Sequence, residues 1–275
     1  MQIELIGCTG AGKSTLSRCI YQASQAQGVE TSMGEEIALK LIGLNWVKRK
    51  ILRTLFVDLI ALFACLASWR DNLEFYHFGT RILSKLPVGR FEKLNIARNV
   101  LKNIGVNEIV RRFGRQEQLV LLDEGTLHTA HYLFVHVSVE PDASDLSDFI
   151  RLIPLPDVVV FVRQDTTTLI QRTLARGHKR IPSGSLEHVE LFIRRAEETF
   201  EKLTQSPEIE SRLLIVDGEQ RITKTEDFQK DPSRVSAFKI ISDGIDPASA
   251  NYPGRSVITR DTKAPEHHRI YHRGE

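Results

Sequence analysis

Short apolar runs alternate with longer segments of helical periodicity along the first 220 residues. The apolar runs are Ile3–Ile6, a weaker one at Val29–Met33, Leu119–Leu122, Asp157–Val162 and Leu213–Val216. Each is short enough for a strand and is bounded by turn residues. Because strands that alternate with helices usually pair in parallel, this order predicts an α/β fold in which helices cover both faces of a parallel sheet.

Polar caps and glycines mark the ends of the helices between these runs. Side chains with an oxygen acceptor favour the start of a helix, and glycine favours its end. The first expected helix runs from Lys13 to about Gln27. The second follows a cap at Asp165 or Thr166 and ends at Arg176. The third follows a cap at Ser185 and runs from about Leu186 to Thr204.

The segment 36–113 is also mostly helical, and it is long for a connection between two strands. Apolar residues recur in it at helical spacing, at Leu52, Leu55, Phe56, Leu59 and Phe63 and again at Phe91, Leu94, Ala97 and Leu101. Turn signals are present at Gly43, Pro87-Val88-Gly89 and Gly105. These signals predict several helices within the segment.

The most apolar part of this segment is Ile51–Trp69. It contains Arg53 and Asp58, and its uninterrupted part is far shorter than the roughly 20 residues that a membrane span needs. We therefore expect a buried or half-buried helix and no transmembrane segment. Because Lys48-Arg49-Lys50 precedes it, contact with a membrane surface stays open as an alternative.

The composition changes after residue 220. We expect one domain over residues 1–220 and a C-terminal tail over 221–275, with one more helix near Val235–Ile241. From Asp243 onward the chain is rich in proline, glycine and charge, so this part is expected to be extended or disordered.

Composition excludes some classes of protein. A hydrophobic fraction of 41% and a charged fraction of 26% over 275 residues are ordinary globular values, and a net charge of +2 gives no reason to expect nucleic acid as a partner. The three cysteines have neither metal spacing nor the even count of a secreted disulfide framework. The apolar start is too short for a signal peptide, so a cytoplasmic protein is expected.

Candidate chemistry begins directly after the first strand, with the motif Gly7-Cys8-Thr9-Gly10-Ala11-Gly12-Lys13-Ser14. Glycines let the backbone curl until several N–H groups converge on one anion, and the helix that follows adds its positive end. Lys13 brings a charge to the terminal phosphates, and the Ser14 hydroxyl is a ligand for Mg²⁺. We expect the nucleotide to bind at Gly7, Cys8, Thr9, Gly10, Ala11, Gly12, Lys13, Ser14 and Thr15.

A carboxylate pair ends the strand Leu119–Leu122. Ligands of doubly wound sheets bind at the carboxyl ends of the strands, so Asp123 is expected beside the phosphate loop, where it and Ser14 would hold Mg²⁺. Capping of the next helix is the alternative for Asp123. For Glu124, contact with a nucleophile or substrate and a solvated position are both open.

A basic cluster follows the strand Asp157–Val162. Arg172 and Arg176 are four residues apart, so they share one face of a helix, while Lys179 and Arg180 follow Gly177 on a loop. Phosphoryl transfer builds negative charge, and a cationic lid would neutralise it. The alternative is a solvated basic face.

These motifs, together with Leu214-Ile215-Val216-Asp217-Gly218, occur in an order that resembles P-loop nucleoside and nucleotide kinases, most closely the thymidylate kinase and deoxynucleoside kinase branch. The resemblance covers roughly residues 1–34 and 117–220. It implies a three-layer P-loop fold with a five-stranded parallel sheet in the order 2-3-1-4-5, ATP with Mg²⁺, and a lid over residues 172–185. It also implies an acceptor-side role for the helical insertion 36–113.

The same branch often has a catalytic carboxylate after its second strand, and Glu35 and Glu36 stand there, with Glu35 preferred. An acidic residue that merely stabilises the start of a helix is the alternative. Two departures leave the acceptor open. Glu124 stands where the branch usually has arginine, and the segment 36–113 is longer and more apolar than the corresponding region.

The leading hypothesis is an ATP-binding phosphotransferase that acts on a small-molecule acceptor, with a nucleoside or nucleotide as candidates. Its catalytic residues would be Lys13, Asp123, Glu35, Arg172, Arg176 and Arg180. The alternative is a P-loop ATPase or GTPase that acts as a switch or binds a partner. The sequence has no Asn-Lys-x-Asp motif and no Leu-Ser-Gly-Gly motif, which disfavours GTPases and transporters. A homodimer stays open.

Overall fold

The structure is a computed structural model that describes residues 1–115, 117–178, 180–181, 184–218, 222–224, 228 and 231–245, with only the backbone of residues 232–233. Its strands are β1 (Gln2–Ile6), β2 (Thr31–Met33), β3 (Leu119–Leu122), β4 (Val158–Val162), β5 (Leu213–Val216) and β6 (Ile222–Lys224). Its helices are α1 (Lys13–Ala26), α2 (Gly34–Leu41), α3 (Lys50–Ala67), α4 (Leu73–Lys85), α5 (Arg90–Phe113), α6 (Thr129–Phe134), α7 (Ala143–Leu152), α8 (Thr166–Arg176), α9 (Leu186–Thr204), α10 (Pro207–Glu210) and α11 (Pro232–Ile245).

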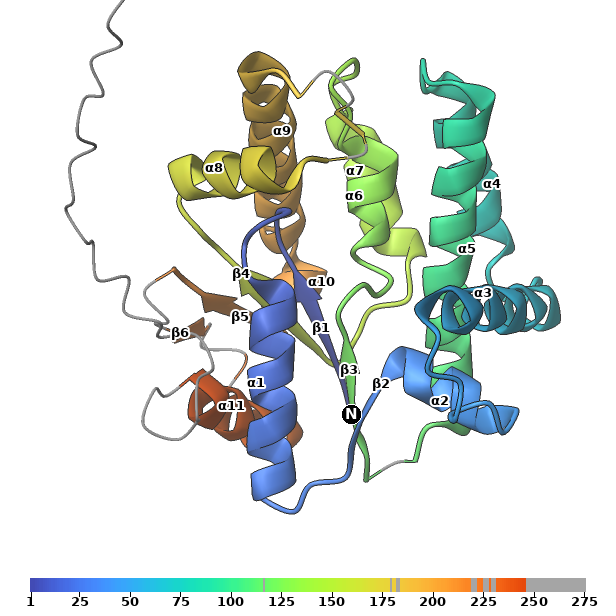
Figure 1. The fold of residues 1–275 in the computed structure, drawn as a ribbon, viewed down its shortest axis with the longest axis vertical. Helices are drawn as coiled ribbons and strands as arrows, with labels where there is room; N and C mark the ends of the chain where they lie inside the picture. The colour runs from blue at the N-terminus through green and yellow to red at the C-terminus, as the bar shows by residue number, and fades with distance from the viewer. Residues whose placement is uncertain are drawn as a thin grey trace, which may run out of the picture.

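One sheet organises these elements, in the order β2-β3-β1-β4-β5-β6 (Figure 1). The first five strands of that order are parallel, and β6 is antiparallel to β5. In the middle of the sheet, Ile3 of β1 lies beside Leu121 of β3 and Val158 of β4. Every residue of β3 and β4 is buried, so helices cover both faces, as the alternating pattern predicts.

The prediction of a five-stranded sheet was wrong by one strand. The sixth strand, β6, consists of Ile222, Thr223 and Lys224, a segment too short and too polar to give a strand signal of its own. It pairs antiparallel with β5 at the edge of the sheet, with Val216 opposite Ile222.

Local sequence signals position the helices that flank the candidate site. Asp165 caps α8 by accepting a hydrogen bond from the N–H of Thr168 at 2.8 Å, and Gly177, with φ of 70°, ends it. Ser185 likewise caps α9 by accepting from the N–H of His188. These oxygen acceptors satisfy N–H groups that have no partner within the helix.

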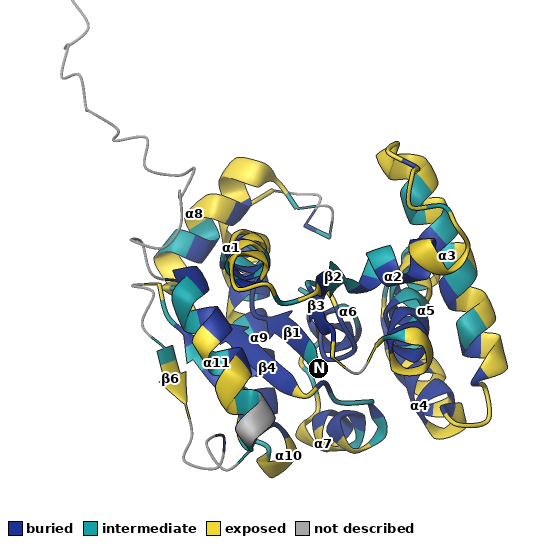
Figure 2. Cartoon of the chain, turned by 90° about the horizontal axis from the view of Figure 1, so that it is seen from below, coloured by how far each residue is buried: buried dark blue, intermediate teal, exposed yellow. Residues whose placement is uncertain are grey.

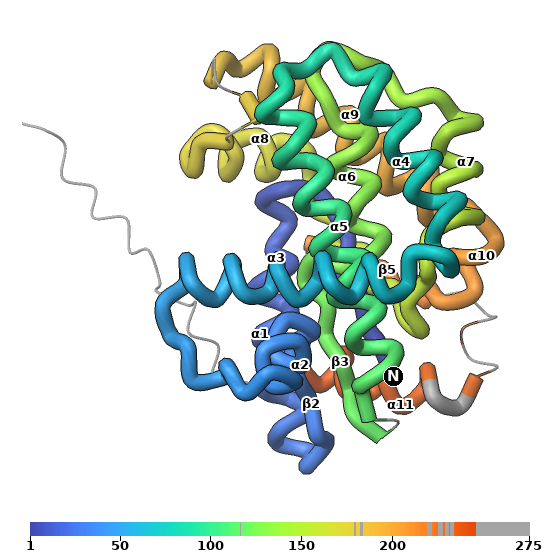
Figure 3. The backbone as a smooth tube through the Cα atoms, turned by 90° about the vertical axis from the view of Figure 1, so that its right-hand side faces the viewer, coloured from blue at the N-terminus to red at the C-terminus, as the bar shows by residue number. Residues whose placement is uncertain are grey.

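The insertion 36–113 contains most of α2 and all of α3, α4 and α5, and the prediction that Gly105 divides helices was wrong. Gly105 lies in the middle of α5, where α3 crosses it (Figure 3). A Cβ atom at this position would collide with the backbone of Ala61 in α3. The glycine is therefore a contact point between two helix backbones and does not end α5.

The expectation that Ile51–Trp69 forms a buried or half-buried helix holds for one face only. The side of α3 that packs on α5 carries Val57, Ala61 and Cys65, which are buried. Leu55, Leu59 and other large apolar side chains of the opposite side are exposed. No helix within the described ranges is long and apolar enough to cross a membrane.

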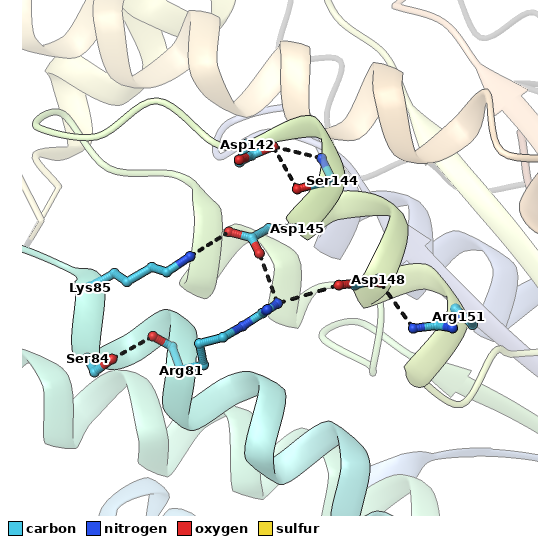
Figure 4. A network of polar contacts seen from close by, with 8 residues as sticks. All are labelled: Arg81, Ser84, Lys85, Asp142, Ser144, Asp145, Asp148 and Arg151. Atoms are coloured by element: carbon cyan, nitrogen blue, oxygen red, sulfur yellow. Dashed lines mark hydrogen bonds and ion pairs between the residues drawn. The ribbon is translucent and has the colours of Figure 1, made fainter.

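Polar contacts tie the insertion to the rest of the molecule between α4 and α7 (Figure 4). Arg81 donates hydrogen bonds to Asp145 at 3.0 Å and to Asp148 at 3.5 Å, and Lys85 lies 3.5 Å from the other carboxylate oxygen of Asp145. Arg151 of α7 contacts Asp148 from the other side. Arg81, Lys85, Asp148 and Arg151 are partly exposed, whereas the Asp145 carboxylate that two of them share is largely buried. The buried carboxylate therefore fixes how α4 and α7 are oriented, and the exposed pairs add little stability.

The described part of the expected tail packs on the domain. Helix α11 lies against α1 (Figure 1), where Gly244 approaches Ile20, and it buries Ala237 and Ile241 in the core. The expected helix near Val235–Ile241 is thus present and longer. The extended or disordered tail was predicted from Asp243 onward, which was wrong for residues 243–245 because they complete α11. Residues 246–275 lie outside the described residues.

Candidate active site

The loop between β1 and α1 has the curled backbone that its glycines predict. Gly7, Gly10 and Gly12 have φ angles of 137°, 86° and 102°, a region that other residues rarely adopt. A Cβ atom at Gly7 would also lie 2.5 Å from the carbonyl oxygen of Val162 in β4. Substitution at these positions would therefore open the loop.

Lys13, the first residue of α1, points back into this loop. Its Nζ atom donates hydrogen bonds to the carbonyl oxygens of Gly7 at 2.8 Å and Cys8 at 2.9 Å. Burial lowers the pKa of Lys13 from its ordinary value, while the negative charges of Asp123 and Glu124 oppose that shift. An anion that enters the loop would thus meet an ammonium group held only by backbone carbonyls.

Ser14 and Asp123 meet at the carboxyl ends of the neighbouring strands β1 and β3. The Ser14 hydroxyl donates to Oδ2 of Asp123 at 2.8 Å. The other oxygen, Oδ1, is buried and has no hydrogen-bond partner among the described residues. A buried carboxylate oxygen without a donor is unfavourable unless a cation or water meets it, so this pair fits Mg²⁺.

Ser14 and Asp123 alone would fill only two of the coordination positions of a Mg²⁺ ion. In the described part of the chain, no group of three or more histidine, cysteine, aspartate or glutamate residues could hold a metal ion. This arrangement suits Mg²⁺, which commonly takes one or two protein oxygens and fills its remaining positions with phosphates and water.

A cavity of about 1050 Å³ opens over this loop. The phosphate-loop wall consists of residues 9–16, of Asp123, which binds Ser14, and of Arg172, which binds Gly10. Arg176, Arg180, Asn95 of α5, Glu124 and His128 also line the cavity. The structure thus brings most of the predicted site residues into one cavity. Gly7 and Cys8 lie at the base of the loop, where they bind Lys13.

The predicted lid cations occupy two different environments. Arg172 donates to the carbonyl oxygen of Gly10 at 2.9 Å, and Arg176, one turn further along α8, is exposed at the cavity. Arg180 instead donates to the carbonyl oxygens of His131, at 3.0 Å, and Val135. The predicted Lys179 lies outside the described residues.

Arg180 is further held by its surroundings. Its guanidinium lies 5.5 Å from the ring centre of Phe192 in α9, and burial lowers its pKa to about 10. These contacts fix the loop after α8 against α6 and α9.

The two acidic residues after β2 lie away from this cavity. Glu35 contacts the Lys102 ammonium of α5 at 3.2 Å, and Glu36 accepts a hydrogen bond from the N–H of Met33 at 3.1 Å. Glu36 has the role of a helix cap, which the sequence offered as the alternative. Neither residue is among the described residues that line the cavity.

Glu124 does line the cavity. Its Oε2 accepts a hydrogen bond from the Tyr132 hydroxyl at 2.8 Å. Burial alone would raise the pKa of Glu124, but nearby His128 and Lys102 and the Tyr132 hydroxyl outweigh it and lower the pKa. Glu124 is therefore a carboxylate at neutral pH.

Glu4 of β1 is a functional candidate that the sequence analysis missed. Its carboxylate is fully buried and accepts hydrogen bonds from the N–H groups of Leu127, at 3.2 Å, and His128, at 2.8 Å. Burial raises its pKa to about 7 against these hydrogen bonds. A lone charged residue inside an apolar strand was the available signal, because such a residue needs buried partners.

The turn that Glu4 holds carries two buried histidines. The rings of His128 and His131 stack with their centres 5.3 Å apart. Burial lowers the pKa of His128 to about 4 and that of His131 well below its ordinary value, so both are neutral near pH 7. The guanidinium of Arg180 lies 3.4 Å from Nδ1 of His131, and its positive charge also favours the neutral form of that ring.

Comparisons with family models and with curated proteins gave no match. Among solved structures, the chain is similar to a deoxyadenosine kinase from M. mycoides with bound dATP. That match has 17% identity and a TM-score of 0.42, and it covers 80% of this chain and 93% of the other. The same kinase with bound dCTP has 18% identity and a TM-score of 0.39, with 80% and 92% covered. At this level of similarity, function has to be inferred from the site itself.

Proposed function

We propose that this chain is a phosphotransferase that moves the terminal phosphate of ATP, with Mg²⁺, to a small-molecule acceptor. The main observation in support is that Ser14 and Asp123 are hydrogen-bonded to each other at the loop that holds the Lys13 ammonium. This arrangement combines a curled anion-binding loop, an ammonium group and a carboxylate with one free buried oxygen. These are the groups that a magnesium-bound polyphosphate needs.

The donor side of the reaction follows from these contacts. The N–H groups of residues 9–15 would hold the phosphates, and Lys13 would exchange its two backbone acceptors for phosphate oxygens. When bound, Mg²⁺ offsets the charge of the phosphates. Ser14 and Asp123 are the residues that would hold it.

The lid cations would act on the group in transfer. Arg176 is exposed at the cavity, so it is placed to meet charge that develops on the transferred phosphate. Arg172 is bound to the phosphate loop itself and would position the loop. Arg180 would keep the connection after α8 in place through its contacts with α6.

The acceptor would bind against the wall formed by Asn95, Glu124 and His128. A cavity of about 1050 Å³ is at the upper limit of sites for one drug-sized ligand, which leaves space for a donor and a small acceptor. Glu124, which lines the cavity, is the proposed contact with the acceptor. We keep Glu35 as the proposed proton acceptor, a role in which its carboxylate would leave Lys102 and turn into the cavity. Nucleosides and nucleotides are the first acceptors to test, because the order of the sequence motifs resembles the kinases that use them.

The test is a transfer assay with ATP labelled on its γ-phosphate. The purified chain is incubated with Mg²⁺ and a panel of nucleosides, nucleotides and sugars, and products are separated by chromatography. We expect a labelled product with at least one acceptor, and none with Lys13→Ala. Release of free phosphate alone, unaffected by every acceptor and stimulated by a protein partner, would instead support the switch function.

A further inference from the structure

The outer side of α3 exposes an apolar surface that the proposed phosphotransferase does not use. We define this α3 surface by Ile51, Leu55, Leu59, Leu62, Phe63 and Leu66, all of which are exposed. At 100° per residue they lie within about 120° of the helix circumference. Ile51 and Phe63 are 83% and 62% exposed, and α3 lies at the edge of the molecule (Figure 2). Surfaces of this kind mark interaction sites.

The charged residues of α3 lie outside this surface. Arg53 points to the other side and lies 3.9 Å from Glu36. Asp58 lies at the border, is largely buried and forms an ion pair with Arg98. The 18-residue helix therefore presents a strip about 27 Å long with no charged side chain inside it.

Basic residues stand at both ends of the strip. Lys48 and Arg49 are exposed before α3, Lys50 is exposed as its first residue, and Arg70 is exposed after it. Near that second end, Arg111 and Arg112 are paired with the carboxylates of Asp71 and Glu108, so the exposed Arg70 supplies the positive charge there. A partner that covers the whole strip would meet positive charge at each end.

This charge distribution disfavours a second copy of the chain as the partner. Parallel pairing of two α3 helices would bring the two Lys48–Lys50 clusters together, and antiparallel pairing would bring each cluster near Arg70 of the other copy. The strip is also wider than a coiled-coil seam. Positions that flank such a seam are usually charged, whereas here Ile51 and Phe63 occupy them.

Tryptophan residues flank the strip. Trp46 precedes α3 and is 72% exposed, and Trp69 follows it, half-exposed and stacked on Tyr76. Tryptophan favours the boundary between lipid chains and water, and basic residues favour anionic headgroups. We propose that the α3 surface docks on an anionic lipid bilayer, with α3 parallel to the membrane and Lys48–Lys50 at the headgroups.

The wild-type chain carries its own reporter for this test, because Trp46 and Trp69 are its two tryptophans. We expect a blue shift of their fluorescence with vesicles of phosphatidylcholine containing about one third phosphatidylglycerol, and a much smaller shift with phosphatidylcholine alone. Absence of a shift, together with absence of co-flotation with the anionic vesicles, would overturn the proposal without any variant.

Variants then locate the surface. The triple variant Lys48→Glu, Arg49→Glu, Lys50→Glu should reduce partitioning onto anionic vesicles at least tenfold. The double variant Leu59→Ser, Phe63→Ser should reduce it about tenfold or more, because it removes apolar area from the strip. Circular dichroism and thermal melting check that both variants fold.

Matched controls lie on the side of the molecule away from α3, on α9 and α11 (Figures 1 and 2). The triple variant Arg194→Glu, Lys202→Glu, Lys239→Glu changes the net charge equally, and Leu186→Ser with Val235→Ser removes exposed apolar side chains. Both should leave partitioning within about twofold of the wild type. Equal losses in controls and α3 variants would show unspecific attraction. A dimer in solution that Leu59→Ser, Phe63→Ser dissociates, without vesicle binding by the wild type, would assign the strip to self-association and reject the membrane.

Discussion

The two walls of the cavity hold their polar groups in opposite ways. On the phosphate-loop wall, Lys13 and Arg172 are cations whose hydrogen bonds go to backbone carbonyls, which a ligand's oxygens can replace. At the turn after β3, His128 lines the cavity and Glu4 and His131 lie buried behind it, and burial shifts the pKa of each of the three toward the neutral form. One wall keeps charge available for a ligand, and the other uses neutral groups to fix a turn.

The difference teaches that burial serves two purposes at one site. Burial of Lys13 strengthens its attraction for an entering anion, because little water competes with it. Burial of Glu4 instead makes its hydrogen bonds to the turn at residues 127–128 costly to break. Mutations on the first wall should therefore change ligand binding and turnover, whereas mutations under the second should change stability and its pH dependence.

The largest expected effect is on the first wall. Lys13→Ala removes the ammonium group that would meet the terminal phosphates, so kcat/KM should fall by about 10²–10³-fold. The increase in melting temperature caused by ATP with Mg²⁺ should disappear as well. Thermal shift and transfer assays measure these effects, with the exposed Lys40→Ala as control. A retained ATP-dependent shift in Lys13→Ala would contradict the site assignment.

The second effect is on stability under the other wall. Burial raises the pKa of Glu4 from 4.5 to about 7, so the folded protein binds this proton more tightly than the unfolded chain does. The resulting stabilisation is fully present below about pH 4.5 and is lost as the pH rises through 7. Relative to Glu4→Gln, which keeps one oxygen acceptor, the wild type should lose about 3 kcal/mol of unfolding free energy over that range. Urea unfolding at several pH values measures the difference.

The histidines give that measurement its control. Burial lowers the pKa of both His128 and His136 to about 4, so their effect on stability has the opposite pH dependence. Their stabilisation is present above pH 6.5 and is lost as the pH falls through 4. Both proteins share this contribution, so it cancels in their difference. A difference between wild type and Glu4→Gln that is constant from pH 4.5 to 8 would show that Glu4 does not titrate near 7.

The next effect is smaller, and it distinguishes the kinetic roles of Arg176 and Arg172. Arg176→Ala should lower kcat by about 10–100-fold and change KM for ATP little, because the exposed guanidinium would meet charge that develops during transfer. Arg172→Ala should mainly raise KM for ATP, because Arg172 binds the phosphate loop through Gly10. Steady-state kinetics with varied ATP measures both. A raised KM for ATP with an unchanged kcat for Arg176→Ala would instead indicate ordinary ground-state binding.

The smallest effect concerns the acceptor. Glu124→Gln should raise KM for the acceptor about tenfold and leave KM for ATP unchanged, because its carboxylate lines the cavity where we propose that the acceptor binds. Tyr132→Phe removes the hydroxyl that holds Glu124 and should give a weaker change in the same direction. If Glu35→Gln lowers kcat while Glu124→Gln leaves both KM values unchanged, the acceptor lies nearer to α2 than we propose.

The sequence predicted the first wall well because its parts are local. Residues 7–15 are contiguous, and the glycine, lysine and serine positions are each required by the backbone conformation or by the charge of the ligand. Strands β3 and β5 also begin and end where their apolar runs do. Asp123 could be placed beside Ser14 because parallel strands bring their carboxyl ends to one edge of the sheet.

The second wall and the insertion could not be predicted in the same way. Glu4 meets its partners 123 and 124 residues further along the chain, and no local pattern records such a pairing. In α3, apolar residues cover both the packed and the outer side, so periodicity alone could not tell which side faces the core. Gly105 has the composition of a turn, but the close crossing of α3 and α5 decides its place.

The two borders of the sheet are formed by its shortest strands, β2 and β6, with three residues each. Few backbone donors and acceptors are therefore left for another chain to pair with. Extension of this sheet by a strand of another molecule, which is a common way in which fibres form, is disfavoured for this reason. Within the described residues, side-chain surfaces are therefore better suited than the sheet edges to contact another macromolecule.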